Sequence, residues 1–302
     1  MKLKINFSTL FITLICLTAQ NAIAQGLVDG FFNKKGEASL SLSYSNSKFD
    51  SFYVGKTKVD GVPAHNEISQ NIFNFYANYG LTDKLTAIVS LPYISAEGDG
   101  DPDPINGTTE QSDIQDLNVM VKYAFYKDEL SSGNMTYFGA FGGSIPLGYE
   151  PNGILSIGNG APALDAKLGM HYYNNNGIFG TLAFGYTVRG DADNNLNLGD
   201  GSDFNAQNSI STLLKVGYNC KMFYIDAWFD SQSSSNKGVD IGGEGFFGNF
   251  PETRVNYARV GGDLFVPIVN NFGVSIGIGA TVDGRNLGNA TTYTGGIVYS
   301  IR

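Results

Sequence analysis

The feature that most restricts the fold of this chain is an alternation of apolar and polar residues that recurs along its length. We count twelve such segments, each about 9–13 residues long and bounded by Gly, Asn, Asp or Pro. In one of them Val274, Ile276 and Ile278 share a face, and the residues between them are Ser and Gly. A period of two places successive side chains on opposite faces of a strand. The pattern therefore predicts an all-β protein.

The connections between these segments alternate in length. Short links lie at 80–84, 127–133, 174–177, 219–221 and 267–272, and long ones near 46–67, 94–113, 148–163, 190–206, 231–254 and 284–290. Short turns at one end and long loops at the other are typical of a barrel whose strands cross a bilayer. We expect a single antiparallel transmembrane β-barrel with 12 strands and periplasmic termini. The alternative is a secreted soluble β-sandwich, which has no reason to sort its connections in this way.

Aromatic residues support the membrane interpretation. Strands that run into short turns, and the last strand, end with a tyrosine on their apolar face: Tyr79, Tyr123, Tyr172, Tyr218 and Tyr299. An amphipathic ring is favoured where membrane meets water, so these five are predicted to form the periplasmic girdle. In the tenth strand Val260 and Leu264 must face lipid, which turns Phe265 inward.

The beginning of the chain has the pattern of an export signal. Lys2 and Lys4 precede an apolar run at 10–17, and Ala22 to Ala24 offer a cleavage site. We expect residues 1–24 to be a signal peptide cleaved near Ala24, residues 25–36 an N-terminal periplasmic segment able to enter the lumen, and residues 37–302 the outer-membrane barrel. The protein would then lie in the outer membrane of a Gram-negative bacterium.

Charge and hydropathy exclude several classes of function. The chain has 28 acidic and 19 Lys or Arg residues, with a net charge of -9, so nucleic acid is excluded as an expected partner. A mean hydropathy of -0.08 excludes a protein of many membrane helices. The expected partners are outer-membrane lipids and small aromatic or apolar solutes.

Several short motifs give the chain a family likeness. They are Tyr79 to Asp83, Leu91 to Tyr93, Asp116-Leu117 leading to Lys122-Tyr123, Ile145 to Gly148, and Gly284 to Asn286. In these the chain resembles the bacterial outer-membrane barrels named for a MetA pathway of phenol degradation. The resemblance implies an uptake channel or a scaffold near the metabolism of aromatic compounds. The chain departs from the family pattern at Gln115, where Gly is typical, and in ending Ile301-Arg302 rather than in Phe.

Strand parity selects the residues that face the lumen. As candidates for a transport path it gives Asp116, Lys122, Lys167, His171, Lys215, Asp226, Trp228, Arg259 and Asp263. Opposite charges on neighbouring strands can pair and hold the wall in shape, whereas unpaired charges line a water-filled path. The sequence leaves both interpretations open.

Two groups of loop residues stand out. Phe246, Phe247 and Phe250 lie in a glycine-rich loop, and we expect them to form a gate over the lumen or to pack against lipid. The loops at 94–113 and 190–206 hold ten acidic residues and no Lys or Arg. Such a field predicts that an open lumen prefers cations.

No catalytic group or metal site is expected. The mature chain has only His65, in the first long loop among polar residues, and His171, which has no Ser two residues on. The run from Asp191 begins like a calcium loop, but it has Leu196 where Gly is required and Ser202 where Glu is required. We therefore expect no enzyme and no cofactor. The predicted function is an outer-membrane channel for passive uptake of small, aromatic or apolar molecules, and the alternative is a scaffold or adhesion barrel that acts through its long loops.

Overall fold

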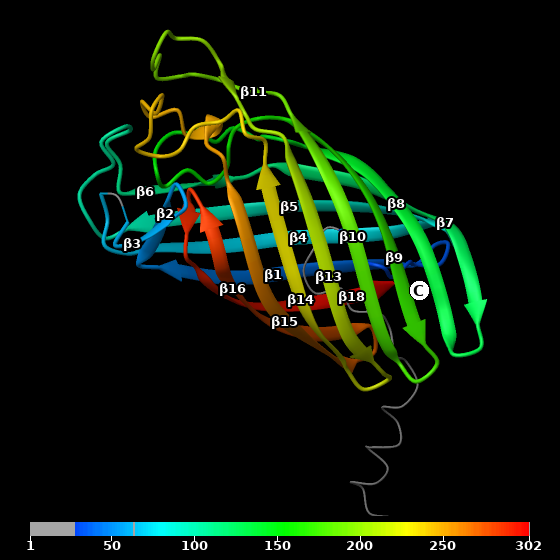
Figure 1. The fold of residues 1–302 in the computed structure, drawn as a ribbon. Coiled ribbons are helices and arrows are strands. Elements are labelled where there is room, and N and C mark those ends of the chain that lie inside the picture. The colour runs from blue at the N-terminus through cyan, green and yellow to red at the C-terminus, as the bar shows by residue number, and fades with distance from the viewer. Residues whose placement is uncertain (1–27, 63, 302) are drawn as a thin grey trace, which may run out of the picture.

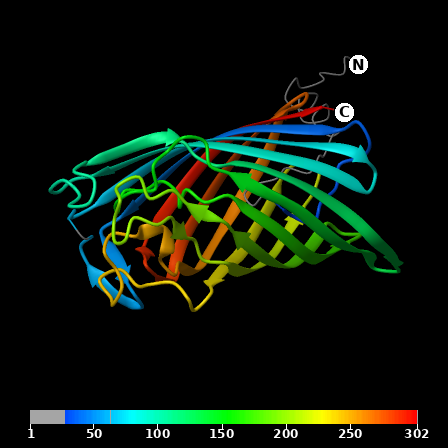
Figure 2. The same ribbon diagram turned by 90° about the horizontal axis from the view of Figure 1, so that it is seen from above.

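The protein forms one closed antiparallel β-barrel (Figures 1 and 2). The structure is a computed structural model that describes residues 28–62 and 64–301, so the expected signal peptide lies outside the described residues. The wall has twelve staves, the sixth and seventh strands together forming one: β1 (Ala38–Phe49), β4 (Ile68–Thr82), β5 (Leu85–Gly98), β6 (Glu110–Ile114) with β7 (Leu117–Leu130), β8 (Gly133–Ile145), β9 (Ala163–Asn174), β10 (Ile178–Arg189), β13 (Ser209–Asn219), β14 (Tyr224–Ser234), β15 (Asn256–Val269), β16 (Phe272–Arg285) and β18 (Thr291–Ile301). The predicted fold and strand number are confirmed.

Pairing between the first and last strands closes the wall. Ala38 lies opposite Ile301, and the register continues to Lys48 opposite Thr291. The chain therefore enters and leaves the barrel at the end that carries the short turns, which we call the turn end. The long connections lie at the other end, the loop end, where they can be followed in Figure 2.

The sequence suggested plain loops for the long connections. In the structure, several of them contain short strands of their own. The first loop forms a hairpin of β2 (Ser51–Val54) and β3 (Thr57–Asp60), and β17 (Leu287–Gly288) pairs with β2. The fourth long connection forms a second hairpin from β11 (Asp191–Ala192) and β12 (Phe204–Asn205). The only helix of the described part is η1 (Phe250–Glu252), one 3-10 turn. No helix in the described ranges is long and apolar enough to cross a membrane.

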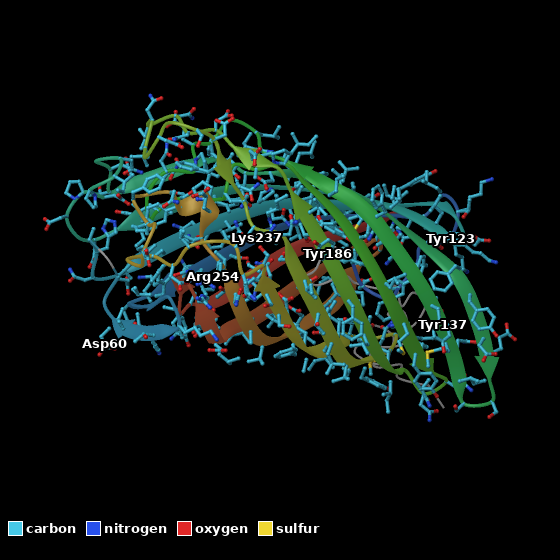
Figure 3. The ribbon with its side chains drawn as sticks, turned by 45° about the horizontal axis from the view of Figure 1, so that its top comes forward. Asp60, Tyr123, Tyr137, Tyr186, Lys237 and Arg254 are labelled. Carbon is cyan, nitrogen blue, oxygen red and sulfur yellow. The ribbon has the colours of Figure 1, made fainter. Side chains whose placement is uncertain are left out.

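The outer surface of the barrel is apolar. Leu168, Ile276 and Phe141 are 65%, 60% and 58% exposed, whereas Lys122 on β7 and Lys215 on β13 are buried inside. In Figure 3, Tyr123 and Tyr137 lie toward the turn end of this surface, and Asp60 lies among the loops at the opposite end. A single closed sheet with its apolar residues outside is incompatible with a soluble sandwich.

The predicted parity is seen at Phe265, and it is interrupted where the register shifts, between Ala124 and Tyr126 and between Ala258 and Arg259. Phe265 is buried inside the barrel, as the sequence of the tenth stave requires. Of the five tyrosines expected as a girdle, Tyr79, Tyr123 and Tyr218 are exposed at the turn end.

The wall has a seam at Gln115, one of the positions where the sequence departs from the family pattern. Below the seam β7 pairs with β5 and β8, but above it β6 pairs only with β5. The loop at 146–162 covers the free edge of β6, because the side-chain amides of Gln111 and Gln115 donate hydrogen bonds to the carbonyls of Glu150 and Ile157, both at 2.6 Å. A side chain at residue 115 therefore takes part in closing the wall.

We predict that the same substitution at two neighbouring leucines has effects of very different size. Leu214 is 45% exposed on the outer face, and Leu213 lines the lumen. An Arg on the lipid face of a membrane barrel costs about 2–4 kcal/mol at the midplane, whereas lumen substitutions are tolerated. Leu214→Arg is expected to reduce the amount of folded, heat-modifiable protein in membranes strongly, and Leu213→Arg only slightly. Equal losses from the two variants would contradict the assigned faces.

Candidate functional site

The lumen contains a cavity of about 880 Å³ in its loop half. Of the predicted lumen residues, Asp116, Lys167, Trp228 and Arg259 line this cavity. The other predicted residues, Lys122, His171, Lys215, Asp226 and Asp263, do not line it and are buried among wall contacts. The structure thus divides the predicted set into a cavity group and a bracing group.

The cavity has an apolar side and a charged side. Phe49, Phe52 and Ile72 come from β1, β2 and β4, and Ile241 and Phe250 from the loop above them. In the ring of twelve staves, β1 and β4 lie opposite β10 and β13. That region and the staves beside it carry five of the six charged residues of the lining: Asp165 and Lys167 on β9, Arg189 on β10, Asp230 on β14 and Arg259 on β15. The sixth, Asp116, lies between β6 and β7. Such a cavity is suited to a molecule with both apolar and polar parts.

Three neighbouring staves are braced by buried charges. The ammonium of Lys215 on β13 lies 2.7 Å from the carboxylate of Asp226 on β14. The hydroxyl of Tyr224 donates to the same carboxylate, and the indole of Trp228 donates to Asp263 on β15 at 3.0 Å. The side chains of Lys215 and Asp226 are almost wholly inaccessible. A buried ion pair of this kind holds its strands in register, because loss of one partner would leave an uncompensated charge.

The turn half of the lumen is filled by the segment before β1. Lys122 donates three hydrogen bonds to it: to the Asp29 carboxylate at 2.8 Å, to the Asp29 carbonyl at 2.9 Å and to the Phe31 carbonyl at 2.5 Å. The Phe31 ring packs edge-on against His171 at 4.6 Å and Phe179 at 5.0 Å between centroids. Val28, at the start of the described segment, lines the cavity. The segment therefore forms the floor of the cavity.

Close packing at Gly30 shows how tightly this segment fits. A Cβ atom at this position would lie 2.2 Å from the His171 ring, so the space accommodates only glycine. His171 itself makes a hydrogen bond of 2.7 Å with the hydroxyl of Thr181. His171 is thus a packing residue of the floor.

The loop end is covered by an apolar cap. Long loops from different parts of the chain contribute to one buried cluster: Phe49, Phe52, Val62, Ile68, Ile94, Ala96, Tyr149, Leu155, Ile157 and Ile241. The rings of Phe246 and Phe250 pack against it, with their centroids 5.2 Å apart. Phe247 is 44% exposed and faces Phe204 of another loop. Of the three phenylalanines expected to form a gate, Phe246 and Phe250 pack together and Phe247 lies apart, and only Phe250 lines the cavity.

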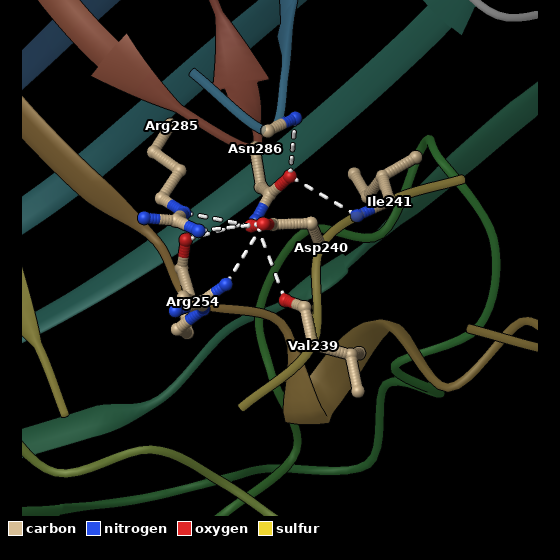
Figure 4. A network of polar contacts seen from close by, with 7 residues as sticks. Val239, Asp240, Ile241, Arg254, Arg285 and Asn286 are labelled. Carbon is tan, nitrogen blue, oxygen red and sulfur yellow. Dashed lines mark hydrogen bonds and ion pairs between the residues drawn. The ribbon is translucent and has the colours of Figure 1, made fainter. Parts of the chain in front are cut away.

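A polar knot ties the cap to the barrel rim (Figure 4). The Asp240 carboxylate accepts hydrogen bonds from Arg285 at 2.7 and 2.5 Å, from Arg254 at 2.8 Å and from Asn286 at 2.9 Å. Asn286 has a positive φ of 54°, and its side-chain oxygen accepts from the amides of Gly55 and Ile241. Three loops meet at this point, so the knot fixes the loop that carries Phe250.

The knot is insensitive to pH near neutrality. Hydrogen bonds from Arg285 and Asn286, together with the positive charges of Arg285 and Arg254, hold the pKa of Asp240 well below its usual range. A carboxylate with a lowered pKa contributes stability above its ordinary pKa of about 3.9 and loses it only as pH falls toward the lowered value. The sequence did not single out Asp240 or Arg254, although Arg285 and Asn286 belong to a motif that carried the family likeness.

The comparisons with known proteins agree with this architecture. Residues 70–294 match the family described as "Putative MetA-pathway of phenol degradation". This chain belongs to that family. No curated protein matches the sequence.

Solved structures place this family member among outer-membrane barrels. An outer membrane channel from Pseudomonas putida F1 superimposes with a TM-score of 0.72 at 15% identity, covering 93% of this chain and 100% of that one. The NanC porin follows with a TM-score of 0.51 at 11% identity, covering 86% of this chain and 98% of that one. These likenesses show that the family member has the fold of an outer-membrane barrel.

Releasing the floor segment is predicted to open the lumen. In Lys122→Gln the segment loses its charged anchor, so we expect a several-fold higher single-channel conductance in planar bilayers. Phe31→Ala, which leaves Lys122 paired, should act in the same direction. Lys84→Gln, in an exposed turn, serves as the control. Unchanged conductance in both folded variants would show that the segment does not limit ion flow.

Breaking the knot is predicted to expose the cap. Asp240→Asn removes the charge that holds two arginines, so trypsin should cut after Lys237 or Arg254 several times faster than in the wild type. Glu244→Gln removes one exposed acidic side chain from the same loop and should leave the rate unchanged. Equal cleavage rates in the wild type and Asp240→Asn would contradict the role given to the knot.

Proposed function

We propose that this protein is an outer-membrane channel for passive uptake of small apolar or aromatic molecules. The observation that carries the proposal is the apolar side of the lumen cavity, where Phe49, Phe52 and Phe250 stand at the loop end of the wall. Apolar surface binds apolar solutes, so aromatic rings at this point favour an apolar or aromatic molecule over a bare ion. The barrel fold of the solved structures supports a membrane location.

The orientation belongs to the same proposal. A signal peptide, residues 1–24, would be cleaved near Ala24. In the outer membrane of a Gram-negative bacterium, the loop end would then face the cell exterior and the termini would lie in the periplasm. The exposed tyrosines at the turn end would then lie at the periplasmic interface of the outer membrane, and the apolar wall would contact outer-membrane lipids. Solutes would meet the cap first and the floor last.

The size of the cavity fits small solutes. Ligand pockets have volumes of roughly 300–1,000 Å³, and this cavity falls in that range at about 880 Å³. The floor, residues 28–33, would have to shift for a solute to leave at the turn end. Passage would be passive, because a difference in solute concentration across the membrane would drive the solute through the lumen.

Uptake by intact cells tests the proposal. Cells poor in other porins that carry this protein should take up radiolabelled toluene several times faster than cells without it, while arabinose uptake stays unchanged. Phe250→Ala should lower toluene uptake at low concentration, because it removes apolar surface from the cavity. Phe247→Ala, an exposed ring outside the cavity, is the matched control. No increase in toluene uptake would favour the scaffold or adhesion alternative.

A further inference from the structure

Two cations on the charged side of the cavity, Arg189 and Lys167, form no ion pair with a carboxylate within the described residues. Arg259 is neutralised by Asp230 at 2.5 Å. Arg189, in contrast, donates only to neutral groups: the Gln207 carbonyl at 2.7 Å, the Ser209 hydroxyl at 2.9 Å and the Gln232 amide at 3.5 Å. A guanidinium has five donors, so Arg189 is positioned by these contacts and keeps the capacity to bind an anion.

Lys167 is the cation with the most unused capacity. Its half-buried side chain lines the cavity, and no hydrogen bond or ion pair joins its ammonium to any residue in the ranges 28–62 and 64–301. The carboxylates of the lining are better supplied. Asp116 accepts from the Tyr149 hydroxyl and Asp165 from the Thr187 hydroxyl, both at 2.6 Å, and Asp230 has Arg259. Lys167 is therefore the charged group of the lining that has no polar partner among residues 28–62 and 64–301.

The two cations are arranged along the barrel axis. Arg189 is the last residue of β10 at the loop end, and Lys167 lies opposite Gly185, four residues deeper. At about 3.3 Å per residue the two backbone positions are roughly 13 Å apart. An anionic group entering from the loop end would thus meet Arg189 first and Lys167 further in, while the aromatic rings stand on the other side of the same cavity.

We propose that the cavity binds an amphipathic molecule that has an apolar, ring-sized body and one anionic group. Arg189 attracts the anion nearer the loop end, Lys167 binds it further in through charge-assisted hydrogen bonds, and Phe49, Phe52 and Phe250 contact the apolar body. This inference rests on the proposed function and narrows its substrate class. The acidic loops act at the mouth, where their field disfavours small anions over a range of about 8 Å at physiological salt. The two cations act below the mouth, where the body of the molecule is also held.

Benzoate is the probe for this proposal, with benzyl alcohol as its neutral counterpart. Equilibrium dialysis of the detergent-purified full-length protein with radiolabelled benzoate measures binding. Trp228 is the only tryptophan of the chain and lines the cavity, so its fluorescence reports whether the probe sits there. We expect saturable binding of benzoate with a change in Trp228 emission. Benzyl alcohol should bind more weakly.

Variants separate the anion site from the general fold. Lys167→Gln should weaken benzoate binding about tenfold, since a hydrogen bond to a charged group contributes about that factor, and should leave benzyl alcohol unaffected. Lys167→Arg keeps the charge and should largely retain binding. Lys237→Gln removes an exposed loop charge outside the cavity and is the control. Heat-modifiability verifies that each variant is a folded barrel.

Two results would overturn the proposal. One is equal binding of benzoate and benzyl alcohol with no effect of Lys167→Gln, and the other is no saturable benzoate binding at all. In either case toluene uptake by cells still decides the proposed channel function separately, because toluene carries no charge.

Discussion

The structure depends on one constraint, which is that no backbone hydrogen-bonding group can remain unpaired in hydrocarbon. The pairing of β1 with β18, from Ala38 opposite Ile301 to Lys48 opposite Thr291, satisfies it by removing both sheet edges. Closure also decides where everything else lies. With an even number of staves, both termini fall at the turn end and all long loops fall at the other.

Twelve staves set the width of the interior, and the width decides what must fill it. Eight strands leave room only for side chains, and sixteen or more leave a wide channel. Here the side chains of the wall do not fill the interior by themselves, and residues 28–33 fill the remaining space in the turn half. Lys122 shows why this filling is specific: a buried ammonium is costly without a partner, and the segment supplies a carboxylate and two carbonyls. In the part of the chain that the structure describes, the loop half retains the cavity.

The alternation in the sequence predicted the staves and the face of each side chain, including the inward Phe265. It could not predict partners, because parity gives the direction of a side chain and not the register between strands. Lys215 and Asp226 were both assigned to the lumen, but their pairing depends on contacts across β13 and β14. The knot at Asp240 could not be predicted from the sequence for a stronger reason. Its members lie on loops 45 residues apart and meet only after the barrel has closed.

The two sides of the cavity are therefore built from different kinds of structure. The charged side belongs to rigid, fully hydrogen-bonded strands, in which Arg189 and Lys167 have fixed spacing. The apolar side is completed by loops, held by Asp240 and Asn286 and by apolar packing. Loops tolerate change better than the strands that they connect. The apolar contacts can thus vary at little cost to the barrel, whereas a change in the charged contacts must be accommodated by the wall itself.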